Sequence, residues 1–329
     1  MSLSELSYLS TVSAAVVFLF ATMMHAAEWA TATVRRQSAA RGRQLAAATA
    51  GAKGAEVTGV TDSAGARPSS EAVEVAEEKS SGWGRMGLGL SVVGTGLIFA
   101  GLITRGMVAE RLPLANMFEF TSMAMGMIAV AYLVANLKFG MTFLGLPVTL
   151  LETIGLGAAV TWFYVDIVPL IPALQSAWFN FHISAAAICA AAFNLAAIVS
   201  ILYLVRRHHD NRVAAGTAHR NYLDKLPSTQ ALDRIAYWCL AFAFPLWTFT
   251  ITAGAIWAQY AWGRFWGWDP KETWSLVTWV IYACYLHARL TAGWRTIVPA
   301  VIAIIGAISF WFNFVGINLL VSGLHSYAM

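Results

Sequence analysis

Apolar residues gather along this chain in eight runs separated by shorter polar segments. A helix needs about 20 predominantly apolar residues to cross a hydrocarbon core about 30 Å thick, and each run is close to that length. The expected membrane spans are residues 8–27, 86–104, 114–135, 145–165, 182–205, 235–256, 274–292 and 297–319. The pattern therefore predicts an all-α protein, a polytopic membrane bundle of about eight transmembrane helices.

The composition supports a membrane protein and narrows its chemistry. Of the 329 residues, 58% are hydrophobic and 12% are charged. The net charge of +4 does not predict nucleic acid binding, because the cations lie in short segments between apolar runs instead of along one face. The three cysteines, Cys189, Cys239 and Cys284, all fall in apolar runs and form no CxxC pair. We expect them to be buried and to carry no thiol–disulfide chemistry.

The positions of Lys and Arg predict the orientation in the membrane. They cluster after the first span, after the fifth span and at the end of the seventh: Arg35, Arg36, Arg41, Arg43; Arg206, Arg207, Arg212, Arg220, Lys225; Arg289 and Arg295. If these segments are cytoplasmic, both chain termini face outward. Arg105 and Arg111 would then lie on the outer side, which counts against the assignment without reversing it.

The chain is expected to divide into three parts. Residues 1–34 form an N-terminal transmembrane helix, which we interpret as a retained anchor because no basic segment precedes it. Residues 35–85 are rich in Ala, Gly, Ser and Glu and predict a flexible cytoplasmic linker. Residues 86–329 form the main membrane domain. The polar segment 206–234 contains His208, His209 and His219, which could bind a metal, although a solvated positive-inside loop is the simpler interpretation.

Tryptophan is concentrated in residues 257–279, which hold six of the fourteen: Trp257, Trp262, Trp266, Trp268, Trp274 and Trp279. An interfacial aromatic belt would explain some of them, and for Trp257, Trp274 and Trp279 it is as good as any other interpretation. Trp262, Trp266 and Trp268 instead belong to the string WGRFWGWDPKE, whose order an anchor does not require. This loop, within residues 257–274, is a candidate binding site.

Each residue type in that string suits a flat ligand. Gly263 and Gly267 would let the backbone approach it closely, and Asp269 followed by Pro270 predicts an N-cap and a helix start. The indoles would stack on a planar macrocycle of the haem type. Arg264 or Lys271 could pair with its propionates.

Histidines supply the expected iron ligands. His182 lies at the outer start of the fifth span and His325 just past the outer end of the eighth, so both should reach the side of the tryptophan loop. There they could grip one haem edge-on, or each could simply form hydrogen bonds at the headgroup level. His287 lies about 20 Å along the seventh span at a rise of about 1.5 Å per residue. A polar side chain at that depth favours a ligand.

Three further polar residues lie within apolar runs. His25, at the inner end of the first span, could be a second inner ligand but better fits a headgroup-level histidine. Glu119 and Glu152 would be costly if ionised in lipid. They could be neutral, paired with cations or part of a polar route, and the residues alone do not decide.

The segment WAQYAWGRFWGWDPKETWSLVTWVIYACYLHARL resembles the tryptophan-rich WWD signature of haem-handling proteins, specifically the CcsA/ResC branch of the type II cytochrome c biogenesis system. RLPLANMFEF, PALQSAWFNFHI and GINLLVSGLHSYA resemble segments of that family in the same order. The similarity covers most of residues 105–329. The string departs slightly from the WWD label, since Phe265 precedes Trp266 and Gly267 separates it from Trp268.

The resemblance implies that His182 and His325 ligate haem iron at an outer site and that His287 ligates a transmembrane haem. That second haem would be completed by a histidine of a Ccs1/ResB-type membrane partner. Haem b would be a transported substrate, moved outward and presented to the CxxCH motif of an apocytochrome c. The substrate cysteines then form two thioether bonds, so this chain needs no nucleophile. We expect a plasma-membrane subunit of a cytochrome c haem lyase, or synthase, complex.

Three other functions are compatible with parts of the sequence. A haem exporter would pass the cofactor on without attaching it. A quinone-linked cytochrome b would keep two permanent haems between histidines within helices, whereas His182 and His325 lie at span ends. A structural scaffold would bind no haem.

Overall fold

The computed structural model describes residues 2–53, 82–218, 222–291 and 297–325 of the chain. The long helices are α1 (Leu3–Lys53), α3 (Gly82–Ala109), α4 (Met117–Phe139), α5 (Gly145–Thr161), α6 (Ala177–Ala214), α7 (Thr229–Trp262), α8 (Pro270–Leu290) and α9 (Val298–Trp311). Short helical segments are η1 (Thr142–Leu144), η2 (Pro172–Leu174), η3 (Tyr222–Lys225), the π-helical η4 (Phe312–Gly316) and α10 (Ile317–Leu320). Each expected span coincides with one of these helices, and the predicted helical membrane bundle is confirmed.

Within the described part of the chain, seven helices are long and apolar enough to cross a membrane. The expected span 274–292 is present as α8 but is not among the seven. Its polar aromatic residues and its basic last turn make it less apolar than its neighbours. It nevertheless lies against α7 and α9.

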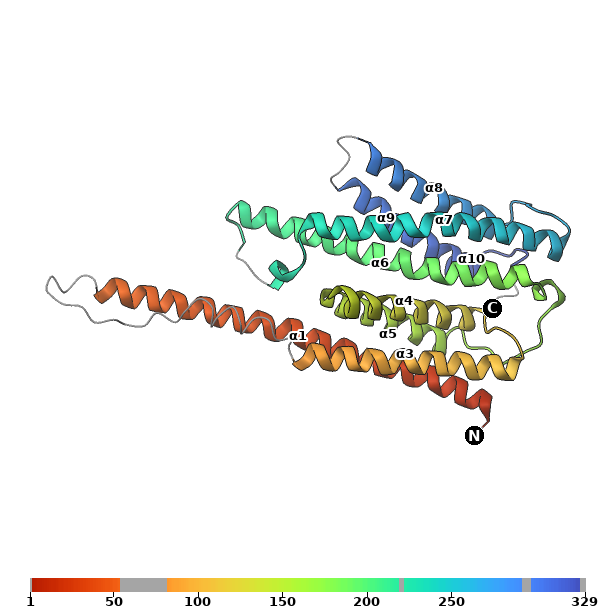
Figure 1. Cartoon of the computed structure of the whole chain (residues 1–329), viewed down its shortest axis with the longest axis horizontal. Coiled ribbons are helices and arrows are strands. Elements are labelled where there is room, and N and C mark those ends of the chain that lie inside the picture. Colours follow the sequence, from red (N-terminus) through yellow and green to blue (C-terminus); the bar gives the residue numbers. More distant parts are fainter. Residues whose placement is uncertain (1, 54–81, 219–221, 292–296, 326–329) are drawn as a thin grey trace.

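The helices form two groups (Figure 1): α1, α3, α4 and α5 in one, and α6 to α10 in the other. Contacts between α4 and α6 join them. The N- and C-terminal ends lie at the same end of the bundle (Figure 1), together with loops 110–116, 162–176 and 263–269. We call this the pocket end. The opposite end, where α6 turns into α7, carries Arg206, Arg207 and Arg212, and we call it the arginine end.

Glu119 pairs with two of the arginines at the pocket end, Arg105 and Arg111. It is fully buried at the start of α4, with Arg105 Nε 2.7 Å from Oε1 and Arg111 Nη1 2.7 Å from Oε2. The backbone N–H of Ala115 also donates to Oε2 at 2.7 Å. Of the states left open for this carboxylate, the structure shows the one paired with cations. Arg105 and Arg111 therefore share one carboxylate, which offsets one of their two positive charges, and they still count against the expected orientation without reversing it.

Among the residues that the structure describes, five indole N–H groups connect separate parts of the fold. They are those of Trp247, Trp257, Trp274, Trp279 and Trp311, which donate to Ser275 O, Ala173 O, Ser309 O, Thr248 Oγ1 and Asn194 Oδ1. An aromatic belt would turn these N–H groups toward lipid headgroups. For Trp257, Trp274 and Trp279 the structure therefore favours a role inside the bundle.

Three features differ from expectation. Helix α1 continues to Lys53, into the segment expected as a linker, because Ala, Arg and Gln are strong helix formers; residues 54–81 lie outside the described residues. Cys189 is buried, but Cys284 is exposed, so its expected burial is wrong. His209 is buried with its Nε2 3.2 Å from Asp224, whereas His208 is exposed and His219 lies outside the described residues.

Candidate functional site

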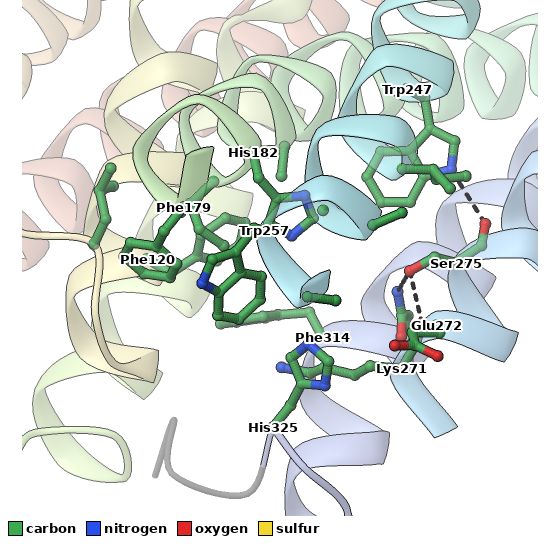
Figure 2. A pocket seen from close by; sticks show the side chains of 18 of the residues that line it. Phe120, Phe179, His182, Trp247, Trp257, Lys271, Glu272, Ser275, Phe314 and His325 are labelled. Atoms are coloured by element: carbon green, nitrogen blue, oxygen red, sulfur yellow. Dashed lines mark hydrogen bonds between the residues drawn. The ribbon is translucent and has the colours of Figure 1, made fainter. Parts of the chain in front are cut away.

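A hollow opens at the pocket end between the first turns of α4 and α6, the last turns of α7, the start of α8 and the C-terminal segment (Figure 2). The empty space in it is about 1000 Å³, including the open solvent at its mouth. Its walls are mostly apolar and aromatic. The polar residues that line it are Asn116, His182, Lys271, Glu272, Ser275, Asn313 and His325.

His182 and His325 meet in this pocket. His182 comes from the second turn of α6 and His325 from the segment after α10. Both rings contact Trp257, with centroid distances of 5.9 Å for His182, which is stacked on it, and 5.6 Å for His325, which meets it edge-on. The two imidazoles point toward one another across the pocket (Figure 2). Sequence reasoning expected both histidines on the side of the tryptophan loop, and the structure places them there.

Each imidazole is held through its Nδ1 atom. His182 Nδ1 lies 2.7 Å from the backbone carbonyl oxygen of Thr250, and His325 Nδ1 lies 2.8 Å from Asp269 Oδ2. Burial lowers the pKa of His325, and the carboxylate of Asp269 only partly opposes that effect. His325 is therefore neutral near pH 7, with its Nδ1–H donating to Asp269.

Asp269 fastens the C-terminal segment to α8. As predicted, it is the N-cap of this helix, where it accepts from the backbone N–H of Lys271 and forms a capping box with Glu272. It also accepts from the backbone N–H of Leu324 at 2.8 Å. Burial tends to raise the pKa of its carboxyl, but the hydrogen bonds from His325 and Leu324 lower it to about 2. Asp269 is not part of the pocket wall, but its hydrogen bond to His325 holds that imidazole in place there.

Gly263 and Gly267, which were expected to let the backbone approach a ligand, instead shape the loop: one ends a helix and the other leaves room for a side chain. Gly263 ends α7 in the left-handed conformation, with φ of 72°. A Cβ atom at Gly267 would lie 1.1 Å from Arg264 Nη1, so the absence of a side chain there leaves room for this guanidinium. Arg264 Nη1 in turn lies 3.5 Å from Glu272 Oε2.

Lys271, not Arg264, is the cation that lines the pocket. Burial lowers the pKa of Lys271 to about 8, and Asp269 opposes that shift. The amine therefore remains mostly protonated at pH 7. Of the two cations that the sequence leaves open as propionate partners, Lys271 lines the pocket and Arg264 does not.

The three tryptophans of the central string have different positions. Trp262 and Trp266 line the pocket, and Trp262 lies 5.0 Å from His325 between ring centroids. Trp268 is 67% exposed and adopts a left-handed conformation with φ of 57°, which is uncommon for a bulky residue. Glu272 holds it there by accepting from the backbone N–H groups on both sides, those of Gly267 and Asp269.

The other candidate residues lie away from the pocket. His287 is in the last turn of α8 and is exposed on the outer face of the helix. His25 is buried toward the arginine end, with Nε2 3.3 Å from Tyr132 Oη and Nδ1 3.4 Å from Glu28. Glu152 is fully buried in α5, and neither of its oxygens has a hydrogen-bond partner among the described residues.

Sequence reasoning missed Trp257 as a site residue. Its indole is 2% exposed and contacts both histidines, because α7 continues to Trp262 instead of ending at the expected boundary near residue 256. The spacing Thr250, Gly254, Trp257 places these three residues on one face of a helix. This helical spacing was the feature of the sequence that could have identified Trp257 as a site residue.

These features define a polytopic membrane protein with an imidazole- and indole-lined pocket at one end of its bundle. The chain belongs to the family described as "Cytochrome C assembly protein", whose model matches residues 90–325, a range that contains His182, His287 and His325. This confirms the family predicted from the tryptophan string and its neighbours.

Several relatives carry the name cytochrome c biogenesis protein CcsA. The protein from Mesostigma viride is 32% identical over 268 residues, which cover 72% of this chain and 87% of the relative. The protein from Guillardia theta is 39% identical over 170 residues, covering 48% and 56%. The protein from Chlamydomonas reinhardtii is 42% identical over 159 residues, covering 48% of this chain but only 43% of that relative's length.

Proposed function

We propose that this chain takes part in cytochrome c maturation as the haem-handling subunit of a type II synthase in the plasma membrane. In this proposal the pocket binds haem b as a substrate and presents it to an apocytochrome c. One observation carries the proposal: His182 and His325, from elements far apart in the sequence, meet beside Trp257 in an aromatic hollow. The family membership supports the same role.

The residues of the pocket fit a haem. Imidazole is the most common protein ligand of haem iron, and two imidazoles face this pocket. Trp257, Trp262 and Trp266 offer aromatic surfaces to a macrocycle. Lys271, half-buried in the pocket wall, would offer a positive charge to a haem propionate.

The attachment chemistry asks little of this chain. Haem supplies two vinyl groups, and the S–H group of each substrate cysteine adds across one vinyl C=C bond, giving a C–S and a C–H bond without any oxidant. The two histidines would fix the position of the haem in the pocket. Lys271 would fix the orientation of the haem by pairing with a propionate. The aromatic walls would exclude water from the reacting edge.

His287 is proposed to act separately. Its side chain is exposed on a helix that packs in the bundle, and Cys284, one turn earlier, is exposed as well. A polar group on such a face is costly in lipid unless it meets a partner. We therefore assign it a ligand role at a transmembrane haem that is completed by a Ccs1/ResB-type partner.

The haem absorption spectrum of the purified chain tests the pocket. Together with its partner, the wild type should copurify with haem, and His182→Ala or His325→Ala should remove one population of it. His287→Ala should remove the other population. His208→Ala, which changes an exposed histidine at the arginine end, is the matched control and should leave the spectrum unchanged. Retention of all haem by both His182→Ala and His325→Ala would reject the pocket as a haem site.

Attachment is tested by coexpression with the partner and an apocytochrome bearing CxxCH. A synthase should leave haem on the apocytochrome after denaturing electrophoresis, because thioether bonds survive denaturation. An exporter should deliver haem outward without producing any covalent adduct. If no covalent adduct forms while the wild-type chain still binds haem, the result would favour export.

A further inference from the structure

The edge of the His182 ring rests directly on the backbone of α7. Its Nδ1 atom lies 2.7 Å from the carbonyl oxygen of Thr250. In an α-helix the residue four positions later lies over such a carbonyl, and that residue is Gly254. A Cβ atom at Gly254 would lie 2.7 Å from His182 Nδ1 and 2.8 Å from its Cε1. The imidazole therefore reaches the carbonyl only because residue 254 has no side chain.

This contact fixes which nitrogen of His182 carries the proton. A backbone carbonyl only accepts, so Nδ1 must be the N–H donor. In the neutral ring the lone pair then belongs to Nε2, as a metal ligand requires. Stacking on Trp257 at 5.9 Å between centroids fixes the plane of the ring.

We infer that Gly254 is a positioning residue of the haem site, because it admits His182 to the Thr250 carbonyl and so sets both the tautomer and the direction of the ligand. The inference rests on the proposed function, in which His182 ligates haem. It adds a determinant on the backbone of α7, where Gly254 lines the pocket beside His182. On the other side of the pocket, the side chain of Asp269 holds Nδ1 of His325 in a similar way.

The test is Gly254→Ala in the full chain, copurified with the partner and examined by haem titration and absorption spectroscopy. Loss of the partner that orients a metal-binding histidine commonly lowers affinity by about 10- to 100-fold. We expect haem affinity in the pocket to fall at least about 10-fold, with loss of the bis-imidazole spectrum. Gly96→Ala is the matched control, because a Cβ atom there meets nothing within 4 Å, and it should bind haem like the wild type.

A double variant separates positioning from general damage. If Gly254 acts through His182, then Gly254→Ala combined with His182→Ala should bind haem no more weakly than His182→Ala alone. Additive losses, or wild-type affinity and spectrum in Gly254→Ala, would overturn the inference.

The single and double variants also show whether Gly254→Ala simply prevents folding. The three atoms nearest to the added Cβ all belong to His182. If Gly254→Ala fails to fold, the double variant should recover, and failure of both would also overturn the inference. Full retention of haem by His182→Ala would instead reject the proposed function itself, whatever Gly254→Ala does.

Discussion

Glu119 holds two positive charges inside the pocket end of the bundle. Arg105 is 2% exposed, and its Nη2 also donates to the carbonyl oxygen of Val165 at 2.8 Å, so it ties loop 162–176 to the same cluster. Burying one carboxylate between two guanidinium groups is tolerable because all three side chains are paired. Removing the carboxylate would leave two charges without compensation.

Glu119→Gln should therefore destabilise the fold. Breaking a buried ion pair from one side commonly costs about 3–5 kcal/mol, because the remaining charge stays buried. We expect a lower thermal unfolding midpoint in detergent and a lower yield of folded protein. Glu110→Gln, which changes an exposed carboxylate near the same loop, is the control and should change little. Equal stability of the two variants would show that the cluster contributes nothing.

For single residues, the sequence predicts which residues belong to the site better than it predicts which side chains contact one another. His182 and His325 could be found because each lies at the end of an apolar run, so that topology alone brings them to one side. The sequence alone could not show whether Arg264 or Lys271 is the cation that lines the pocket. The answer depends on the left-handed conformation of Gly263 and on the space above Gly267, where the guanidinium of Arg264 lies near Glu272 and is not part of the pocket wall.

Helices are where the sequence is most informative, because the apolar runs alone locate all of the long helices. Their ends are harder to predict, since a helix can continue beyond the apolar run. Helix α7 extends past the expected boundary and so brings Trp257 into the pocket. Helix α1 extends to Lys53 through residues that are polar but favour helix.

Close packing among α1, α3, α4 and α5 depends on His25 and two glycines. Cβ atoms at Gly87 and Gly145 would lie 2.7 Å and 2.5 Å from atoms of the His25 ring. The same ring lies within hydrogen-bonding distance of Tyr132 on α4. One side chain from α1 thus fills the space that α3 and α5 leave open.

Gly145→Ala should loosen this packing. An extra methyl group in a filled interior commonly costs about 1–3 kcal/mol, and here it would displace His25 from Tyr132. A lower thermal unfolding midpoint in detergent is expected. Gly157→Ala, on the same helix but with nothing within 4 Å of the added Cβ, should keep the wild-type midpoint. If both variants unfold at the wild-type temperature, His25 does not control the helix contacts.

At the scale of the whole molecule, the densest run of arginines lies at the end of the bundle opposite the pocket. The pocket end carries His182 and His325, together with Arg105, Arg111, Arg264 and Lys271. Arg105 and Arg111 pair with Glu119, and Arg264 lies 3.5 Å from Glu272. Figure 1 shows both ends of the chain at this end of the bundle. The arginine end carries the run at 206–212 beyond the membrane-spanning part of α6. Under the positive-inside rule this difference predicts that the arginine end is cytoplasmic, which would place the pocket where an apocytochrome c outside the membrane could reach it.

Cysteine labelling in intact cells tests that orientation. In a parent with Cys189, Cys239 and Cys284 replaced by Ala, single cysteines are introduced at Val168, exposed at the pocket end, or at Ala215, exposed at the arginine end. A membrane-impermeant maleimide should label Val168→Cys in intact cells and Ala215→Cys only after the membrane is opened. The cysteine-free parent should remain unlabelled. Labelling of Ala215→Cys alone in intact cells would place the pocket on the cytoplasmic side, where the proposed haem site could not meet an external apocytochrome.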